Sequence, residues 1–328
     1  MTRWLRVLGK WLLTAAIAVA LWWTVDLSAV GAALRGAHWG WIGLAVVLLP
    51  VNLALDGWVW ARLLRGSPGA TSPRQVGAAL FCGFALGFWT PARLGEYAGR
   101  AFSLPEADPW SVSVSVFAQR MVDMLVGVGV GLGVLLGTLY TDLLPASAAW
   151  SGAALIGVGT TAGLGAAVLA PGRCVSWVEP LSRWVSGLAG RLRSLRRLGA
   201  QDAGPVLGGT VVRYFVFTGQ FVCLSLALAP DLPPVALCAA VALTFYAKYL
   251  IPSLTLLDLG IREGGAVLFF EALGLPPAVG LSAALLLFTL NVLLPAAGGL
   301  PFVWRLASPR QSAPADEAPQ DVPVIAEP

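Results

Sequence analysis

Two short segments of a mostly apolar chain hold charged residues at spacings that could build a binding site. In the first, Pro91 is followed by Arg93, Glu96 and Arg100. If the chain resumes a helix after the proline, spacings of three and four residues bring these side chains to one face, where they can pair. We therefore expect arginines gathered around one carboxylate.

The second segment has a similar composition. Lys248 precedes Pro252, Asp258 lies four residues before Arg262, and Glu263 follows directly. A helix that restarts after the proline would again bring acid and base to one face. The half-helix N-termini created by the two prolines would also point positive dipole ends at the same ligand.

Further polar residues fall within long apolar stretches. Arg120 and Asp123 are three residues apart and share a helical face. Asn52 and Asp56 lie four apart in an earlier stretch, and Asn291 lies in the last one. These three could line a cavity, and helix–helix hydrogen bonds explain them equally well.

Recognition of an ionic ligand is the chemistry that suits these groups. Arginine presents a fixed fork of donors that matches phosphate or carboxylate. Each charge at mid-membrane costs at least about 2.5–3.5 kcal/mol, so such charges usually serve a function. The alternative is that the ion pairs only hold the segments in place. The predicted substrate-binding residues are Arg93, Glu96, Arg100, Arg120, Asp123, Lys248, Asp258, Arg262 and Glu263.

Composition decides the class of protein that carries these residues. Of 328 residues, 57% are hydrophobic and 12% charged, and the mean hydropathy is +0.78. A soluble domain needs a larger charged surface. The net charge of +4 does not indicate nucleic-acid binding, because the basic residues cluster at the ends of apolar stretches. No metal or other cofactor is expected, since the four cysteines form no CxxC pair and His38 is the only histidine.

The elements that must position the charges are membrane-spanning helices, since lipid leaves no backbone group unpaired. A span takes about 20 apolar residues. Trp39 and Trp41 at one end of the second stretch, and Trp58 and Trp60 at the other, are typical interface anchors. The predicted spans cover residues 11–26, 40–61, 112–139, 149–170, 207–229 and 278–304.

The distribution of charge predicts orientation and topology. Basic residues precede the first span, follow the second and the last, and fill a loop over 171–206, which places both termini in the cytoplasm of a bacterial-type inner membrane. Segments 75–110 and 234–275 must then each return to the side they entered from. The prediction is an all-α polytopic membrane protein with about six full spans plus two re-entrant helical hairpins in an inverted repeat. Ordinary pairs of short helices are the alternative.

The remaining segments receive simpler assignments. The integral membrane domain is expected to cover 1–307, and the Pro-, Ala- and acid-rich tail over 308–328 to be disordered and cytoplasmic. Residues 177–201 carry tryptophans and leucines at helical spacing among arginines. They fit a helix lying on the anionic cytoplasmic leaflet or a basic loop that only fixes orientation.

Several motifs follow one another in a fixed order: Pro91-x-Arg93-Leu94-Gly95-Glu96-Tyr97, Arg100, Gln119-Arg120-x-x-Asp123, and later Gly260-Ile261-Arg262-Glu263-Gly264 with Asn291. Their order and spacing, over residues 8–305, resemble the lysylphosphatidylglycerol synthase transmembrane-region family. In bifunctional members this region resembles a flippase for an aminoacylated phospholipid that a separate cytosolic domain makes. About 23 residues follow Arg305, so we expect a stand-alone member without the aminoacyltransferase domain. Ala92 stands where the commonest first motif has glycine.

The leading hypothesis is a translocase for an anionic or zwitterionic phospholipid or glycolipid, and not an enzyme. The arginines would hold the phosphate, the carboxylates would position them or meet a cationic head group, and Lys248 could do either. No GxxxxGK[ST] loop is present, so ATP is not expected to drive the protein directly. The alternatives are a membrane-embedded lipid-modifying transferase that uses the carboxylates as acid and base, and a structural partner of a separately encoded lipid synthase or glycosyltransferase.

Overall fold

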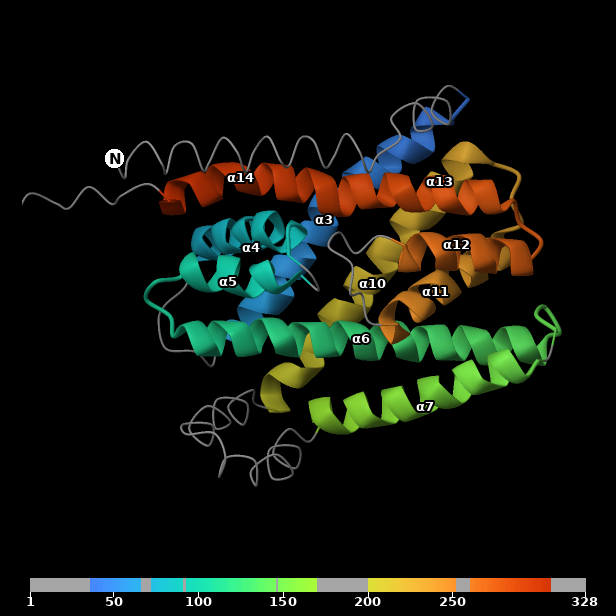
Figure 1. The fold of residues 1–328 in the computed structure, drawn as a ribbon, viewed down its shortest axis with the longest axis horizontal. Helices are drawn as coiled ribbons and strands as arrows, with labels where there is room; N and C mark the ends of the chain where they lie inside the picture. Colours follow the sequence, from blue (N-terminus) through green and yellow to red (C-terminus); the bar gives the residue numbers. More distant parts are fainter. Residues whose placement is uncertain are drawn as a thin grey trace, which may run out of the picture.

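A computed structural model describes residues 36–65, 72–90, 93–145, 147–169, 200–251 and 260–307, and throughout these ranges the regular structure is helical. Figure 1 shows long helices along the long axis of the molecule and two pairs of shorter helices between them. The elements are α3 (Trp39–Leu64), α4 (Pro73–Phe88), α5 (Leu94–Phe102), α6 (Pro109–Tyr140), α7 (Ala148–Leu169), α10 (Ala200–Leu228), α11 (Pro234–Leu250), α12 (Ile261–Ala272), α13 (Pro277–Phe288), the π-helical turn η3 (Thr289–Leu293) and α14 (Leu294–Ala307).

Within the described ranges, five stretches are long and apolar enough to cross a membrane: Trp39–Leu64, Pro109–Tyr140, Ala148–Val168, Ala203–Leu228 and Pro277–Arg305. Five of the six predicted spans therefore coincide with such helices. The first predicted span, 11–26, lies outside the described residues. The last span is not a uniform α-helix, because η3 interrupts it between α13 and α14.

The first charged segment folds as two antiparallel helices, α4 and α5. A capping box at Ser72 and Gln75, with Pro73 at the first helical position, starts α4. The chain then turns back, and α5 packs so closely on α4 that a Cβ at Gly99 would lie 2.7 Å from the carbonyl oxygen of Cys82. Only glycine permits this approach.

The second charged segment folds in a similar way into α11 and α12, which pack on each other. Pro234 occupies the first turn of α11, where its missing N–H costs nothing. The second helix of this pair, α12, begins at Ile261. Pro252 itself lies outside the described residues.

The packing of the remaining helices relates the two halves of the chain. α3 and α10 run antiparallel, since Gln220 contacts Ala45 near one end and Gly209 lies beside Trp58 near the other. α4 packs on α14, while α11 packs on α6, so each hairpin contacts the helix that follows the other hairpin. In Figure 1 the two hairpins lie toward opposite ends of the long axis.

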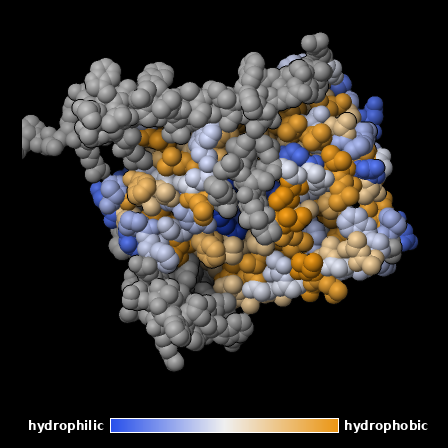
Figure 2. All heavy atoms as spheres, in the orientation of Figure 1, coloured by the Kyte–Doolittle hydropathy of each residue, from blue (hydrophilic) through white to orange (hydrophobic). Residues whose placement is uncertain are grey.

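Apolar side chains are distributed as a membrane protein requires. The largest buried cluster joins the helices α6, α10, α11, α12 and α13 around Phe221, Phe245 and Phe270. A smaller one surrounds Trp60, whose Nε1 donates to Ser115 Oγ at 2.9 Å. Figure 2 shows hydrophobic residues over much of the visible face, with hydrophilic ones toward both ends and a small group near the middle. The exposed apolar residues therefore suit contact with lipid.

Two predicted segments fall largely outside the described residues. These are most of the basic loop over 171–206, which includes the possible surface helix, and the tail over 308–328. At the end of the loop, α10 already begins at Ala200, so residues 200–206 are helical.

The hairpin contact yields a stability prediction. Gly99→Ala forces α4 and α5 apart, because the new Cβ meets backbone atoms of Cys82 and Gly83. We expect a loss of about 1–3 kcal/mol, measured by thermal unfolding in detergent. Gly77→Ala in α4 is the matched control, since nothing lies within 4 Å of a Cβ there. Equal melting of the two variants would contradict this account of the hairpin.

Candidate functional site

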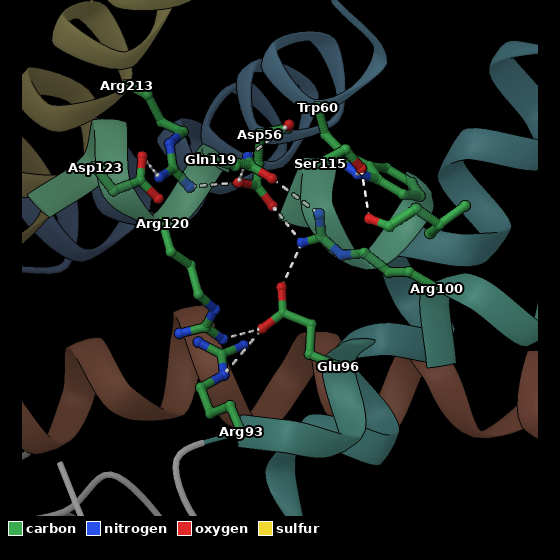
Figure 3. Close-up of polar contacts among 11 residues, drawn as sticks. Asp56, Trp60, Arg93, Glu96, Arg100, Ser115, Gln119, Arg120, Asp123 and Arg213 are labelled. Atoms are coloured by element: carbon green, nitrogen blue, oxygen red, sulfur yellow. Dashed lines mark hydrogen bonds and ion pairs between the residues drawn. The ribbon is translucent and has the colours of Figure 1, made fainter. Parts of the chain in front are cut away.

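Charged residues from four helices meet in one buried network (Figure 3). α5 supplies Glu96 and Arg100 and is preceded by Arg93, while α6, α3 and α10 supply the others. Four of the predicted residues are thus in direct contact, and the fifth, Asp123, is joined to them through other side chains. The members are Asp56, Arg93, Glu96, Arg100, Gln119, Arg120, Asp123 and Arg213.

Glu96 is the point on which three arginines converge. Its Oε1 accepts a hydrogen bond from Arg100 Nη2 at 2.5 Å. Its Oε2 accepts one from Arg120 Nη2, also at 2.5 Å, and lies 3.4 Å from Arg93 Nε. The pairing of Glu96 with Arg100 confirms the helical spacing argument, and Arg93, which precedes α5, also pairs with Glu96 as expected. Arg120 pairs with Glu96 of the hairpin, and Asp123 on its own helix pairs with Arg213.

A second layer of contacts fixes Arg100 beneath Glu96. Arg100 Nη1 donates to Gln119 Oε1 at 2.9 Å, and Gln119 Nε2 donates to Asp56 Oδ1 at 2.8 Å. The guanidinium of Arg100 also lies 4.6 Å from the ring centroid of Trp60. Because the Arg100 side chain is only 2% exposed, these groups replace its lost hydration.

Arg213 connects the network to the second half of the chain. Its Nη1 donates to Asp56 Oδ1 at 2.5 Å, and its Nη2 pairs with Asp123 Oδ1. Sequence reasoning missed this residue. The available signal was that Arg213 is the only charged residue in the apolar stretch 207–229, and an intramembrane arginine is by default a candidate for function.

Local backbone structure frees Glu96 to reach the arginines. Arg93 has a left-handed backbone (φ 56°), and the N–H of Gly95 donates to Thr90 Oγ1 at 2.6 Å. A threonine therefore satisfies one donor at the start of α5. Glu96, the third residue of α5, is thereby left available for ion pairs.

The corresponding glutamate of α12 is used differently. Glu263 is also the third helical residue, after Gly260 with φ 109°, but its Oε2 accepts the N–H of Gly260 at 2.8 Å. Its Oε1 pairs with Arg262, which lies 5.5 Å from the ring centroid of Phe288. Arg262 and Glu263 thus pair with each other, and no described contact joins them to the network around Glu96. Lys248 lies in the last turn of α11, and Asp258 falls outside the described residues.

Among the described residues, the network contains more arginine than carboxylate. In these ranges Arg93, Arg100, Arg120 and Arg213 face Asp56, Glu96 and Asp123, which leaves one positive charge when all are ionised. Asp123 and Arg213 lie near the middle of α6 and α10, two helices long enough to span the membrane. An unbalanced charge in such a place is costly unless an anion joins it.

A hydrogen bond one turn from Asp56 connects α3 to the last span. Asn52 Nδ2 donates to Asn291 Oδ1 at 2.8 Å, so the helix–helix explanation holds for this pair. Asn291 lies within η3, and π-helical turns occur frequently at functional sites. In the described ranges, no three His, Cys, Asp or Glu side chains are grouped to hold a metal ion.

Comparison with known proteins decides the family. The sequence model of the lysylphosphatidylglycerol synthase TM region matches residues 8–299 of the chain. The chain belongs to this family. A comparison with curated proteins gives no match. As a member of the lysylphosphatidylglycerol synthase TM-region family with several apolar helices, the chain is a multi-pass membrane protein with a lipid-related function.

The role of Arg213 in this TM-region protein can be tested by stability. Arg213→Met leaves Asp56 and Asp123 buried without their shared cation, and breaking such a pair costs about 3–5 kcal/mol. We expect a clearly lower melting temperature in detergent, partly restored by adding Asp56→Asn. Arg74→Met, at an exposed position, is the control and should shift stability by no more than about 0.5 kcal/mol. Unchanged melting of Arg213→Met would refute the structural role given to this arginine.

Proposed function

We propose that the chain is a translocase that moves an anionic or zwitterionic phospholipid or glycolipid between the leaflets of a bacterial-type inner membrane. The observation that carries this proposal is the buried network, which includes residues near the middle of α6 and α10 and which, among the described residues, has one arginine in excess of its carboxylates. An ionic head group needs polar partners to pass the hydrocarbon core, whereas its acyl chains can remain in the bilayer.

The helix packing supports an inverted repeat with two re-entrant hairpins. A two-fold relation exchanges α3 with α10, the hairpin α4–α5 with α11–α12, and α6 with α13–α14, and it preserves the pairings of α4 with α14 and of α11 with α6. Because α3 and α10 are antiparallel, the axis of this relation lies in the membrane plane. Rocking of one half against the other would then expose the network to each side in turn.

The ends of the helices support the proposed orientation. Arg65 follows α3, Arg74 opens α4 and Arg305 lies near the end of α14, whereas Asp142 and Asp231 follow α6 and α10. By the positive-inside rule, the arginine-bearing ends face the cytoplasm, and we propose the same side for both termini.

We propose a transporter without a chemical step. Each carboxylate of the network contacts at least one arginine guanidinium, which suits a positioning role better than acid–base catalysis. A separately encoded lipid synthase or glycosyltransferase would supply the lipid.

The proposal is tested by the leaflet accessibility of a fluorescent phospholipid in proteoliposomes. We expect the wild-type protein to move the lipid, and Arg120→Ala and Glu96→Gln to slow it at least tenfold by removing contacts at the network. Arg74→Ala is the matched control and should transport normally. Equal rates for all four proteins, or none above empty vesicles, would reject the proposal.

A further inference from the structure

Exposure divides the network into a fixed part and an accessible part. The side chains of Arg100 and Asp56 are 2% and 8% exposed, whereas those of Arg93 and Arg120 are 24% and 32% exposed. Gln119 bridges Arg100 to Asp56. Among the described residues, Arg93 and Arg120 have no such bridge, and both meet one oxygen of Glu96. An incoming ligand can therefore reach these two arginines without dismantling the rest.

Hydrogen-bonding capacity is left over on the accessible side. One carboxylate oxygen, Glu96 Oε2, faces two guanidinium groups, each with five donors. Arg93 Nε and Arg120 Nε are buried atoms with no hydrogen-bond partner in the part of the chain that the structure describes, although Arg93 Nε lies 3.4 Å from Glu96 Oε2. The Nε atoms of Arg100 and Arg213 have none either. Buried donors normally find partners, so the guanidinium groups of the network can serve a further acceptor, which reaches them on the accessible side.

Charge and surroundings define the missing acceptor. The surplus of one positive charge matches a monoanion with two oxygens, which is the form of a phosphodiester; a phosphomonoester dianion would reverse the imbalance. Leu94, which follows Arg93 at the start of α5, is 62% exposed. An exposed apolar side chain next to Arg93 suits a phosphate that is attached to acyl chains better than a free one.

We propose that Arg93 and Arg120 form a clamp for one phosphodiester of a lipid head group, and that Glu96 Oε2 occupies the place of this phosphate when the clamp is empty. The lipid phosphate displaces Oε2, while Oε1 stays on Arg100 and keeps α5 attached to the buried part. The assignment rests on the proposed function, because a transported lipid supplies the phosphodiester. It narrows the arginines predicted for the phosphate to two, since Arg100 and Arg262 are held by buried partners.

The placeholder role of Glu96 is tested by lipid rescue of the full chain in a neutral detergent. Glu96→Gln removes the anion that the clamp holds, so this variant should melt below the wild type. Phosphatidylglycerol should restore its melting temperature in a saturable way. A phosphate-free glycolipid with the same acyl chains, or inorganic phosphate alone, should not. Recovery by the glycolipid to the same degree, or no recovery by phosphatidylglycerol, overturns the proposal.

A second pair of variants covers the case in which Glu96→Gln does not fold. Arg93→Gln and Arg120→Gln keep the pair of Glu96 with Arg100 and should each weaken phosphatidylglycerol binding about tenfold, read from the concentration that stabilises the protein. Arg74→Gln is the control and should bind like the wild type. Unchanged binding by both clamp variants overturns the clamp. Binding without transport in proteoliposomes refutes the translocase and leaves the clamp standing. Transport that Glu96→Gln slows, but that Arg93→Gln and Arg120→Gln leave unchanged, refutes the clamp and leaves the translocase standing.

Discussion

The cost of burying arginine inside an apolar helix bundle is the constraint on which the rest of this structure depends. Arg100 and Arg213 cannot stay in a low-dielectric interior unless carboxylates and amides replace water around them. Asp56 contacts both arginines. Glu96 supplies a second carboxylate to Arg100, and Asp123 supplies one to Arg213. Four helices, α3, α5, α6 and α10, are thereby held together at one place.

This constraint explains the broken hairpin. A continuous helix through residues 73–102 would carry Arg93, Glu96 and Arg100 away from α3 and α6. The turn back after α4, the left-handed Arg93 and the cap from Thr90 instead place Glu96 beside Arg100 and Arg120. In the second hairpin a residue with positive φ, Gly260, likewise precedes α12. The glutamate there, Glu263, accepts the N–H of Gly260 and so caps its own helix. The two halves thus share an architecture, while the charge network belongs mainly to the first.

Local pattern predicted much of the fold and part of the site. Apolar length identified five of the described helices, and spacings of three and four residues predicted the contacts of Glu96 with Arg93 and Arg100. The partner of Asp123 could not be predicted from the sequence, because Arg213 lies on a helix far along the chain and no helical period relates the two residues. The pairing of these two residues depends on packing between distant segments. The prediction that Pro252 creates a half-helix N-terminus concerns residues outside the described ranges.

The central claim is that the network holds a phosphodiester lipid at its accessible arginines. Native mass spectrometry of the protein released from membranes in mild detergent tests it most directly, by identifying the lipids that stay bound. The account predicts that the wild type and Arg74→Gln retain phosphodiester lipids and that the double variant Arg93→Gln/Arg120→Gln loses them. The same bound lipids on all three proteins, or only phosphate-free lipids on the wild type, would contradict it.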